Sequence, residues 1–147
     1  MKIAVGCDHA AYEMKQKVME HLKQRGIEYK DFGTYTPDAS DYPLVALDTA
    51  KAVLSGEFDK GIVMCGTGVG ISIAANKVKG IRCALLSDTF SAKATRQHND
   101  ANMMAMGARV IGIGLALDIV DAFLDTPFSG LERHQRRIDM ITKIENE

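Results

Sequence analysis

Short apolar runs of strand length alternate along the chain with longer segments in which apolar residues recur at helical spacing. The apolar run at 61–65 (GIVMC) is almost wholly hydrophobic, which is typical of the centre of a parallel sheet. The runs that predict strands are residues 2–7, 27–32, 61–65, 81–86 and 102–106. The segments that predict helices are residues 11–25, 43–54, 71–77, 115–124 and 132–145, and residues 87–98 predict a loop followed by a helix.

This alternation predicts an α/β fold, a three-layer α/β/α sandwich with about five mostly parallel strands. A chain of 147 residues fits one domain over residues 1–147, because a second core would be too small. Ligands of such sheets lie beyond the carboxyl ends of the strands, so polar side chains directly after strands are candidates for a site. They are Asp8-His9, Cys65-Gly66, Ser87-Asp88 and the polar residues near His98.

Composition and charge narrow the classes of partner. Hydrophobic residues make up 46% of the chain and charged residues 25%, and the formal net charge is −1. The chain therefore has no overall positive electrostatic potential that would attract nucleic acid or an anionic membrane. An anionic ligand needs a local cluster of basic groups instead. The start, MKIAVGCDHA, is too short and polar for a signal peptide, and the apolar stretch at 110–120 is too short for a membrane span. We expect a cytoplasmic protein without nucleic-acid or membrane partners.

The three cysteines, Cys7, Cys65 and Cys83, are an odd number in a chain without an export signal, which argues against a disulfide framework. No CxxC or HxxxH pair offers metal-ligand spacing, so we expect no metal. Cys7 ends a strand without a following glycine turn and is expected in the core. Cys83 lies inside a strand and is expected to be inert packing.

A glycine loop, CGTGVG at 65–70, joins the third strand to a helix. Its glycines let backbone amides turn toward a ligand, and the helix dipole favours negative charge there, as on a phosphate or a reaction oxyanion. Cys65 stands directly before this turn, which favours the thiolate, a possible base or nucleophile. The alternative is a core cysteine that merely ends an apolar strand. The GxGxG spacing only loosely matches a dinucleotide fingerprint, although Asp88 lies about twenty residues on.

The other polar groups each allow two interpretations. Asp8-His9 is either a helix cap or a pair at the ligand crevice. His98 is either a partner of a helix dipole or a neutral imidazole that moves a sugar hydroxyl proton. Arg133 and Arg137, four residues apart on one helix face, are either a solvated patch or a phosphate-binding fork. Arg109 lies in a mostly apolar stretch and needs a partner if it is buried.

Six segments follow one another over nearly the whole chain. They are GCDHA at 6–10, DYP at 41–43, CGTGVGISIAANK at 65–77, RQHNDAN at 96–102, GARVIG at 107–112 and RHQRR at 133–137. In this order they closely resemble the B-type ribose-5-phosphate isomerases, within a wider family that includes galactose-6-phosphate isomerase subunits.

The resemblance implies a Rossmann-like homodimer or dimer of dimers, without a cofactor, whose sites are shared between subunits. It implies that Cys65 takes the proton from C2 of the open-chain sugar and returns it at C1. His98 would assist ring opening, and Thr67 with the loop amides would hold the enediolate. His9, Arg133 and Arg137 would bind the phosphate, with Arg109 reaching in from the neighbouring subunit. The full set of implied substrate-binding residues is Asp8, His9, Tyr42, Gly66, Gly68, Val69, Gly70, Asn99, Arg109, Arg133 and Arg137.

The resemblance favours ribose 5-phosphate and ribulose 5-phosphate as the substrate pair, because the RHQRR segment and the complete set of matches lie in one chain. Two alternatives remain open at this point. One is an isomerase of a hexose 6-phosphate, allose or galactose, since sequence does not show the depth of the pocket. The other is a binding module for a nucleotide or sugar phosphate that uses the same loop without chemistry.

Overall fold

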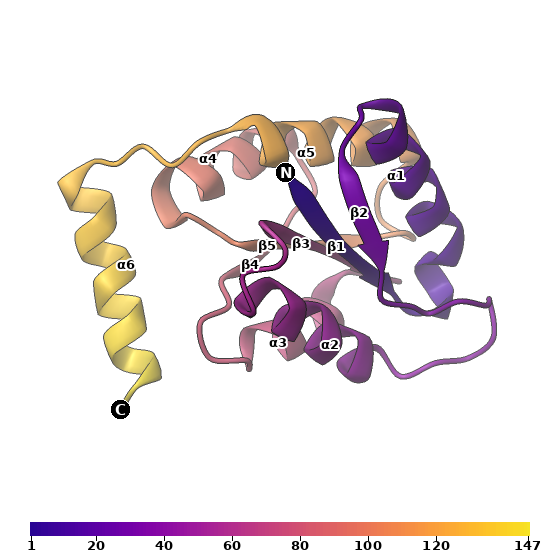
Figure 1. Ribbon diagram of the computed structural model, residues 1–147, viewed down its shortest axis with the longest axis horizontal. Coiled ribbons are helices and arrows are strands. Elements are labelled where there is room, and N and C mark those ends of the chain that lie inside the picture. Colours follow the sequence, from indigo (N-terminus) through magenta and orange to yellow (C-terminus); the bar gives the residue numbers. More distant parts are fainter.

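The computed structural model describes residues 1–147 and contains one parallel sheet of five strands in the order β2-β1-β3-β5-β4 (Figure 1). This confirms the predicted α/β class and the predicted number of strands. The strands are β1 (Lys2–Cys7), β2 (Glu28–Asp31), β3 (Lys60–Cys65), β4 (Cys83–Leu85) and β5 (Met103–Gly107). All four neighbouring pairs are parallel.

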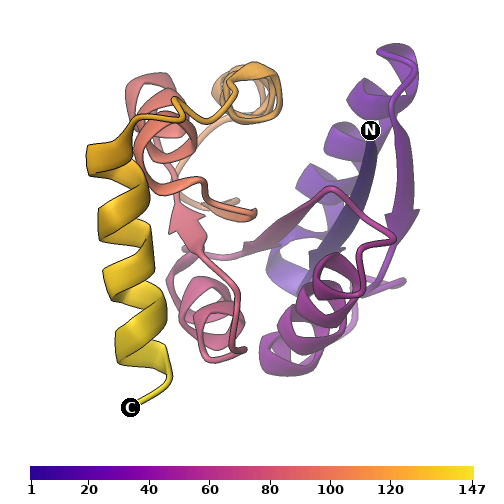
Figure 2. The same cartoon turned by 60° about the vertical axis from the view of Figure 1, so that its left-hand side comes forward.

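Helices cover both faces of the sheet, which makes three layers (Figures 1 and 2). One face packs against α1 and α5, whose Leu22 and Phe123 are fully buried there. The other face packs against α2 and α3, which bury Ala50 and Ile71. After the 3₁₀ turn η1 (His9–Ala11), the helices are α1 (Tyr12–Gln24), α2 (Tyr42–Leu54), α3 (Val69–Asn76), α4 (Thr89–Asn99), α5 (Ile113–Asp125) and α6 (Glu132–Glu145). No helix is both long enough and apolar enough to cross a membrane.

All elements begin and end within two residues of the predicted bounds, and the differences at β4 and α3 have local causes. Strand β4 is shorter than residues 81–86, because the amide of Arg82 donates to Asn102 Oδ1 at 2.9 Å and strand pairing begins only at Cys83. Helix α3 begins at Val69, two residues earlier than predicted, because Gly68 adopts a left-handed conformation (φ 77°) and turns the chain into the helix.

The direction of the chain crossovers reverses between β1 and β3, which makes this the topological switch point of the sheet. These neighbours are followed by helices on opposite faces, α1 after β1 and α3 after β3, which opens the carboxyl edge of the sheet at that point. There the amide of Asp8 donates to the Met64 carbonyl at 3.1 Å. The ends of β1 and β3 therefore present Asp8 and Cys65 side by side.

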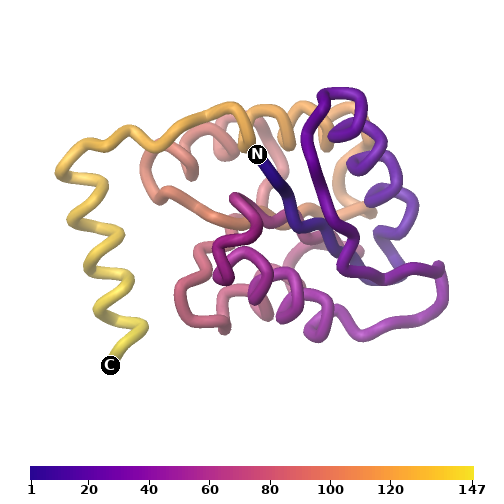
Figure 3. The backbone as a smooth tube through the Cα atoms, in the orientation of Figure 1, coloured from indigo at the N-terminus to yellow at the C-terminus, as the bar shows by residue number.

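The last helix lies along one side of the molecule. In Figures 1 and 3 the chain leaves α5 in an extended segment and α6 runs along the side of the sheet, beyond α4. Of its apolar residues, Ile138 is 7% exposed, whereas Ile141 and Ile144 are 46% and 70% exposed. The last turn still contacts the rest of the chain, because Glu145 Oε1 accepts the amide of Gly80 at 2.8 Å.

Candidate functional site

The glycine loop curls back onto the sulfur of Cys65. The amide of Gly68 donates to Cys65 Sγ at 3.1 Å, and the thiol side chain is almost buried, with the residue 4% exposed. Thr67 Oγ1 accepts the amide of Val69, the first residue of α3, at 3.2 Å, and this hydrogen bond is exposed at the surface. A backbone N–H donor therefore lies against this sulfur at the N-terminus of a helix.

The loop rests on the backbone of β5. The amides of Ala108 and Arg109 donate to the carbonyls of Cys65 and Gly66, both at 2.9 Å. A Cβ on Gly107 would lie 2.5 Å from the carbonyl carbon of Thr67. Only glycine therefore fits at position 107, and this residue of the site was not singled out by sequence reasoning, although it opens the GARVIG segment.

Arg109 lies beside the same loop of its own chain. A Cβ on Gly66 would meet the Arg109 guanidinium at 3.4 Å and the Ala10 methyl at 3.6 Å. The guanidinium therefore lies with Cys65 and with the turn that carries His9. Arg109 thus lies beside the glycine loop of its own chain, and its expected contribution to the site of a neighbouring subunit stays a prediction.

Asp8 and His9 follow β1 as expected. Asp8 is 6% exposed, and its Oδ1 caps η1 by accepting the Ala10 amide at 2.9 Å, so the cap interpretation is confirmed. The Nδ1 of His9 accepts the amide of Ser40 at 3.2 Å, and Ser40 Oγ accepts the His9 amide at 3.1 Å. With Nδ1 occupied as an acceptor, the neutral ring carries its proton on Nε2, which is then a donor for an anion.

Tyr42 opens α2 and lies over the start of α3. A Cβ on Gly70 would stand 2.8 Å from the hydroxyl oxygen of Tyr42. Tyr42 is 37% exposed, so its hydroxyl borders both the loop and solvent. The structure therefore brings together Asp8, His9, Tyr42, Cys65, Thr67 and Arg109, along with loop residues Gly66, Gly68, Val69 and Gly70.

A second group of predicted residues lies at the other edge of the sheet. His98 and Asn99 end α4, and β5 begins shortly afterwards at Met103, which pairs with Gly61 at the amino end of β3. Cys65 pairs with Gly107 at the opposite end of these two strands, about 13 Å away for four strand residues. The expectation that the polar residues near His98 lie at the carboxyl edge is wrong, because α4 returns the chain to the amino edge before β5.

Arginines accompany His98 at that edge. Arg133 and Arg137 are exposed on the first turns of α6, and between them His134 is 5% exposed. The ring centroids of His98 and His134 are 4.5 Å apart at an interplanar angle of 41°. Sequence reasoning did not select His134, and only its place inside RHQRR could have marked it.

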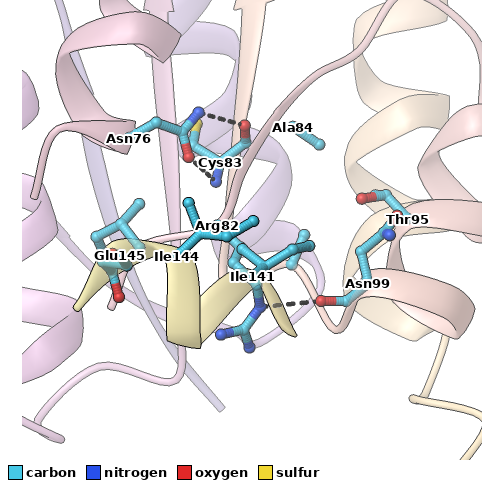
Figure 4. A pocket seen from close by; sticks show the side chains of 11 residues that line it. Asn76, Arg82, Cys83, Ala84, Thr95, Asn99, Ile141, Ile144 and Glu145 are labelled. Carbon is cyan, nitrogen blue, oxygen red and sulfur yellow. Dashed lines mark hydrogen bonds between the residues drawn. The ribbon is translucent and has the colours of Figure 1, made fainter. Parts of the chain in front are cut away.

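Asn99 takes part in a cavity of about 490 Å³ between β4, α4 and α6 (Figure 4). Its carbonyl accepts Arg82 Nε at 2.9 Å, and the carbonyl of Asp100 accepts the same guanidinium at 2.8 Å. Arg82 therefore satisfies the last carbonyls of α4, which fixes the turn that carries His98 and Asn99. The cavity is lined by Asn76, Ile81, Arg82, Cys83, Ala84, Thr95, Asn99, Ala101, Ile141, Ile144 and Glu145.

The remaining expected sites are structural. Cys7 and Cys83 are buried, and removal from solvent raises the pKa of each thiol to about 12, so both are packing residues as predicted. Asp88 caps α4 by accepting the Ser91 amide at 2.6 Å. His, Cys, Asp and Glu side chains do not gather anywhere in groups of three that could hold a metal ion.

The chain therefore carries two half-sites. One offers a thiol under backbone amides, with an imidazole and a guanidinium beside it. The other offers two imidazoles and two guanidiniums. The first can remove a carbon-bound proton and hold the resulting oxyanion, and the second can move a hydroxyl proton and bind phosphate.

A family model described as Ribose/Galactose Isomerase matches residues 3–141. The chain belongs to this family. The Escherichia coli K12 protein named ribose-5-phosphate isomerase B is 51% identical over 144 residues, covering 98% of this chain and 96% of that protein. A Clostridium acetobutylicum protein named galactose-6-phosphate isomerase subunit LacB is 43% identical, covering 100% of this chain and 86% of that protein.

Solved structures agree on the fold. The Clostridium thermocellum ribose-5-phosphate isomerase B superposes with a TM-score of 0.97 at 52% identity, covering 99% of this chain and 98% of that one. The Mycoplasma genitalium ribose-5-phosphate isomerase B, solved with bound ribulose-5-phosphate, gives a TM-score of 0.94 at 40% identity, with coverage of 99% and 97%. The predicted family and the predicted three-layer fold are thus confirmed.

Proposed function

We propose that this chain interconverts D-ribose 5-phosphate and D-ribulose 5-phosphate. The observation that carries the proposal is the hydrogen bond from the Gly68 amide to Cys65 Sγ, 3.1 Å long, at the N-terminus of α3. It puts a thiol directly under a backbone amide, next to further donors for an oxyanion. The similarity to proteins named ribose-5-phosphate isomerase B supports the choice of substrate.

In the proposed reaction the Cys65 thiolate takes the proton from C2 of the open-chain aldose and becomes a thiol. The electron pair of the broken C–H bond forms a C1–C2 double bond, and the charge moves to the oxygen on C1. The amides of residues 66–70 and the Thr67 hydroxyl hold the enediolate oxygens. The hydroxyl proton on the C2 oxygen then moves to the charged oxygen on C1. Cys65 returns its proton to C1, the C1–C2 double bond is lost, and the oxygen on C2 becomes the carbonyl. The proposed sugar contacts are Asp8, Tyr42 and Asn99.

The second half-site supplies the remaining steps. His98 assists opening of the furanose ring, and Arg133 and Arg137 bind the phosphate together with His9 and Arg109. Because the two half-sites lie at opposite edges of one sheet, a complete site needs His98, Arg133 and Arg137 from a second copy of the chain. We therefore propose a cytoplasmic homodimer, or a dimer of dimers, that works without cofactor or metal.

A hexose 6-phosphate is the second candidate substrate. The 43% identity to a protein named galactose-6-phosphate isomerase subunit LacB favours it. Parallel assays with ribose 5-phosphate, allose 6-phosphate and galactose 6-phosphate decide between them. A kcat/KM higher for either hexose phosphate would replace the pentose assignment.

Cys65→Ala tests the chemistry. We expect turnover to fall by at least about a hundredfold, the lower range for a lost general base, while the fold and the binding of ribose 5-phosphate are retained. Cys83→Ala is the matched control, because that thiol is buried packing with a pKa of about 12. Full activity of the Cys65→Ala protein would remove this residue from the mechanism.

A further inference from the structure

His134 is held in place by a serine from the segment between α5 and α6. Its Nδ1 lies 2.6 Å from Ser129 Oγ, and Ser129 Oγ also accepts the amide of Leu131 at 3.2 Å. The amide of Ser129 donates to the carbonyl of Gln97 at 3.2 Å, one residue before His98. Ser129 therefore ties the imidazole of α6 to the last turn of α4.

The surroundings of the His134 ring favour its neutral form. Its removal from solvent lowers its pKa, and the nearby His98, Arg133 and Arg137 lower it further, whereas the Gln97 carbonyl raises it. A neutral ring packs beside a second imidazole without charge repulsion. This agrees with the 4.5 Å separation of the His98 and His134 centroids.

His98 needs such a support. It lies exposed on the final turn of its helix, where a side chain is otherwise distributed over several rotamers. The His134 ring packs against one side of the His98 ring. His134 also lies on α6 between Arg133 and Arg137, the two arginines proposed to bind phosphate. The buried His134 thus connects His98, proposed to open the sugar ring, with Arg133 and Arg137, proposed to bind phosphate.

We propose that His134 is a positioning residue, which holds the His98 imidazole at a fixed place relative to Arg133 and Arg137 so that it meets the ring oxygen of a bound sugar phosphate. This inference rests on the proposed function, because it gives His98 a partner in ring opening. Small displacements of a proton-transfer group cost large factors in rate, so a residue that fixes the group is needed for full activity.

The two directions of the reaction separate this role from a structural one. Ribose 5-phosphate closes into a furanose and must be opened. Ribulose 5-phosphate stays open, because the hydroxyl that would close its ring carries the phosphate. A variant with defective ring opening can still convert the ketose and release the open aldehyde, which closes in solution. Loss of fold or of the Cys65 step instead slows both directions together.

The experiment measures initial rates from both sugar phosphates with His134→Phe, which keeps a ring but loses the bond to Ser129, and with Ser129→Ala, which leaves the imidazole in place. We expect kcat from ribose 5-phosphate to fall about tenfold or more in His134→Phe, and by a smaller factor in Ser129→Ala, with kcat from ribulose 5-phosphate changed less than about twofold. Arg136→Gln is the matched control on the same helix, because Arg136 is exposed and pairs only with Glu132 at 3.7 Å.

Each outcome has a defined meaning. Equal losses in both directions, or unchanged rates in both variants, would overturn the positioning role. If His134→Phe does not fold, the Ser129→Ala ratio decides alone. His98→Asn gives the reference for the difference between the two directions of the reaction. If this variant loses the same factor in both directions, the role of His98 in ring opening is refuted, while the proposed isomerisation is not. A wild-type protein inactive on both sugars would instead refute the proposed function.

Discussion

Gly107, the last residue of β5, lies directly against Thr67 of the glycine loop. A Cβ at position 107 would stand 2.5 Å from both the carbonyl carbon and the carbonyl oxygen of Thr67. This contact joins backbone to backbone, so no side chain can rotate away to relieve it. The distance between the loop and the sheet is therefore set by the absence of a side chain at one position.

Replacing Gly107 with Ala should displace the loop and misalign its amides relative to Cys65. We expect a loss of about 1–3 kcal/mol in the free energy of unfolding, as for other overpacked sites, together with a fall in kcat. Urea denaturation and steady-state assays measure both. Gly114→Ala in α5 is the control, since a Cβ there meets nothing within 4 Å, and it should be neutral or stabilising. Equal behaviour of the two variants would contradict the role of the close approach.

Lys15 is fully buried, and its ammonium bonds Asp31 Oδ1 at 2.6 Å and the carbonyl of Thr34 at 2.5 Å. Lys15→Met leaves the Asp31 carboxylate without its cation, so we expect a loss of about 3 kcal/mol in the free energy of unfolding. The double variant Lys15→Met/Asp31→Asn should recover part of it, because the unpaired charge is gone and the amide of Gly33 keeps its acceptor. Chemical denaturation of Lys15→Met, of Asp31→Asn and of the double variant is the measurement. A double variant as unstable as the sum of the two single changes would argue against this pair.

The buried thiols predict a loss of stability at alkaline pH. Burial raises the pKa of Cys7 and Cys83 from 9.0 to about 12 in the folded protein. Their stabilising contribution is complete below pH 9 and disappears as pH rises toward 12, because the unfolded chain releases the protons first. The free energy of unfolding should therefore fall between pH 9 and pH 12. Cys83→Ala should show a shallower fall than the wild type over this range, and an equal slope would refute the assignment.

Mixing two inactive variants tests whether subunits share sites. In a hybrid of Cys65→Ala and His98→Asn subunits, one site receives both defects and the other receives neither. Random exchange at equal amounts should restore about a quarter of wild-type activity on ribose 5-phosphate, since half the dimers are hybrids with one intact site. The readout is activity after unfolding and refolding together, with each variant refolded alone as the control. No recovery from a mixture that forms hybrids would mean that each chain contains its own complete site.

Much of the fold could be predicted because the pattern of apolar and polar residues along each element is a local property of the sequence. The alternation of apolar runs and helical stripes reflects which faces of each element are buried, and that is written into neighbouring residues. The rule that ligands meet the carboxyl ends of strands then placed Asp8, His9 and Cys65 at one edge. The same rule failed for His98, because the polar residues near it lie at the end of α4 and do not follow a strand.

The amino-acid sequence by itself determined the element types, the three layers, the glycine loop after β3 and the inert character of Cys7 and Cys83. Only the tertiary structure decided the close approach of Gly107 to Thr67, the place of Arg109 beside Gly66, and the contact of His98 with His134. These relationships join residues 36 to 43 positions apart in the chain. They depend on how β5 and α6 pack against the rest, and local periodicity carries no information about the distance between two packed elements.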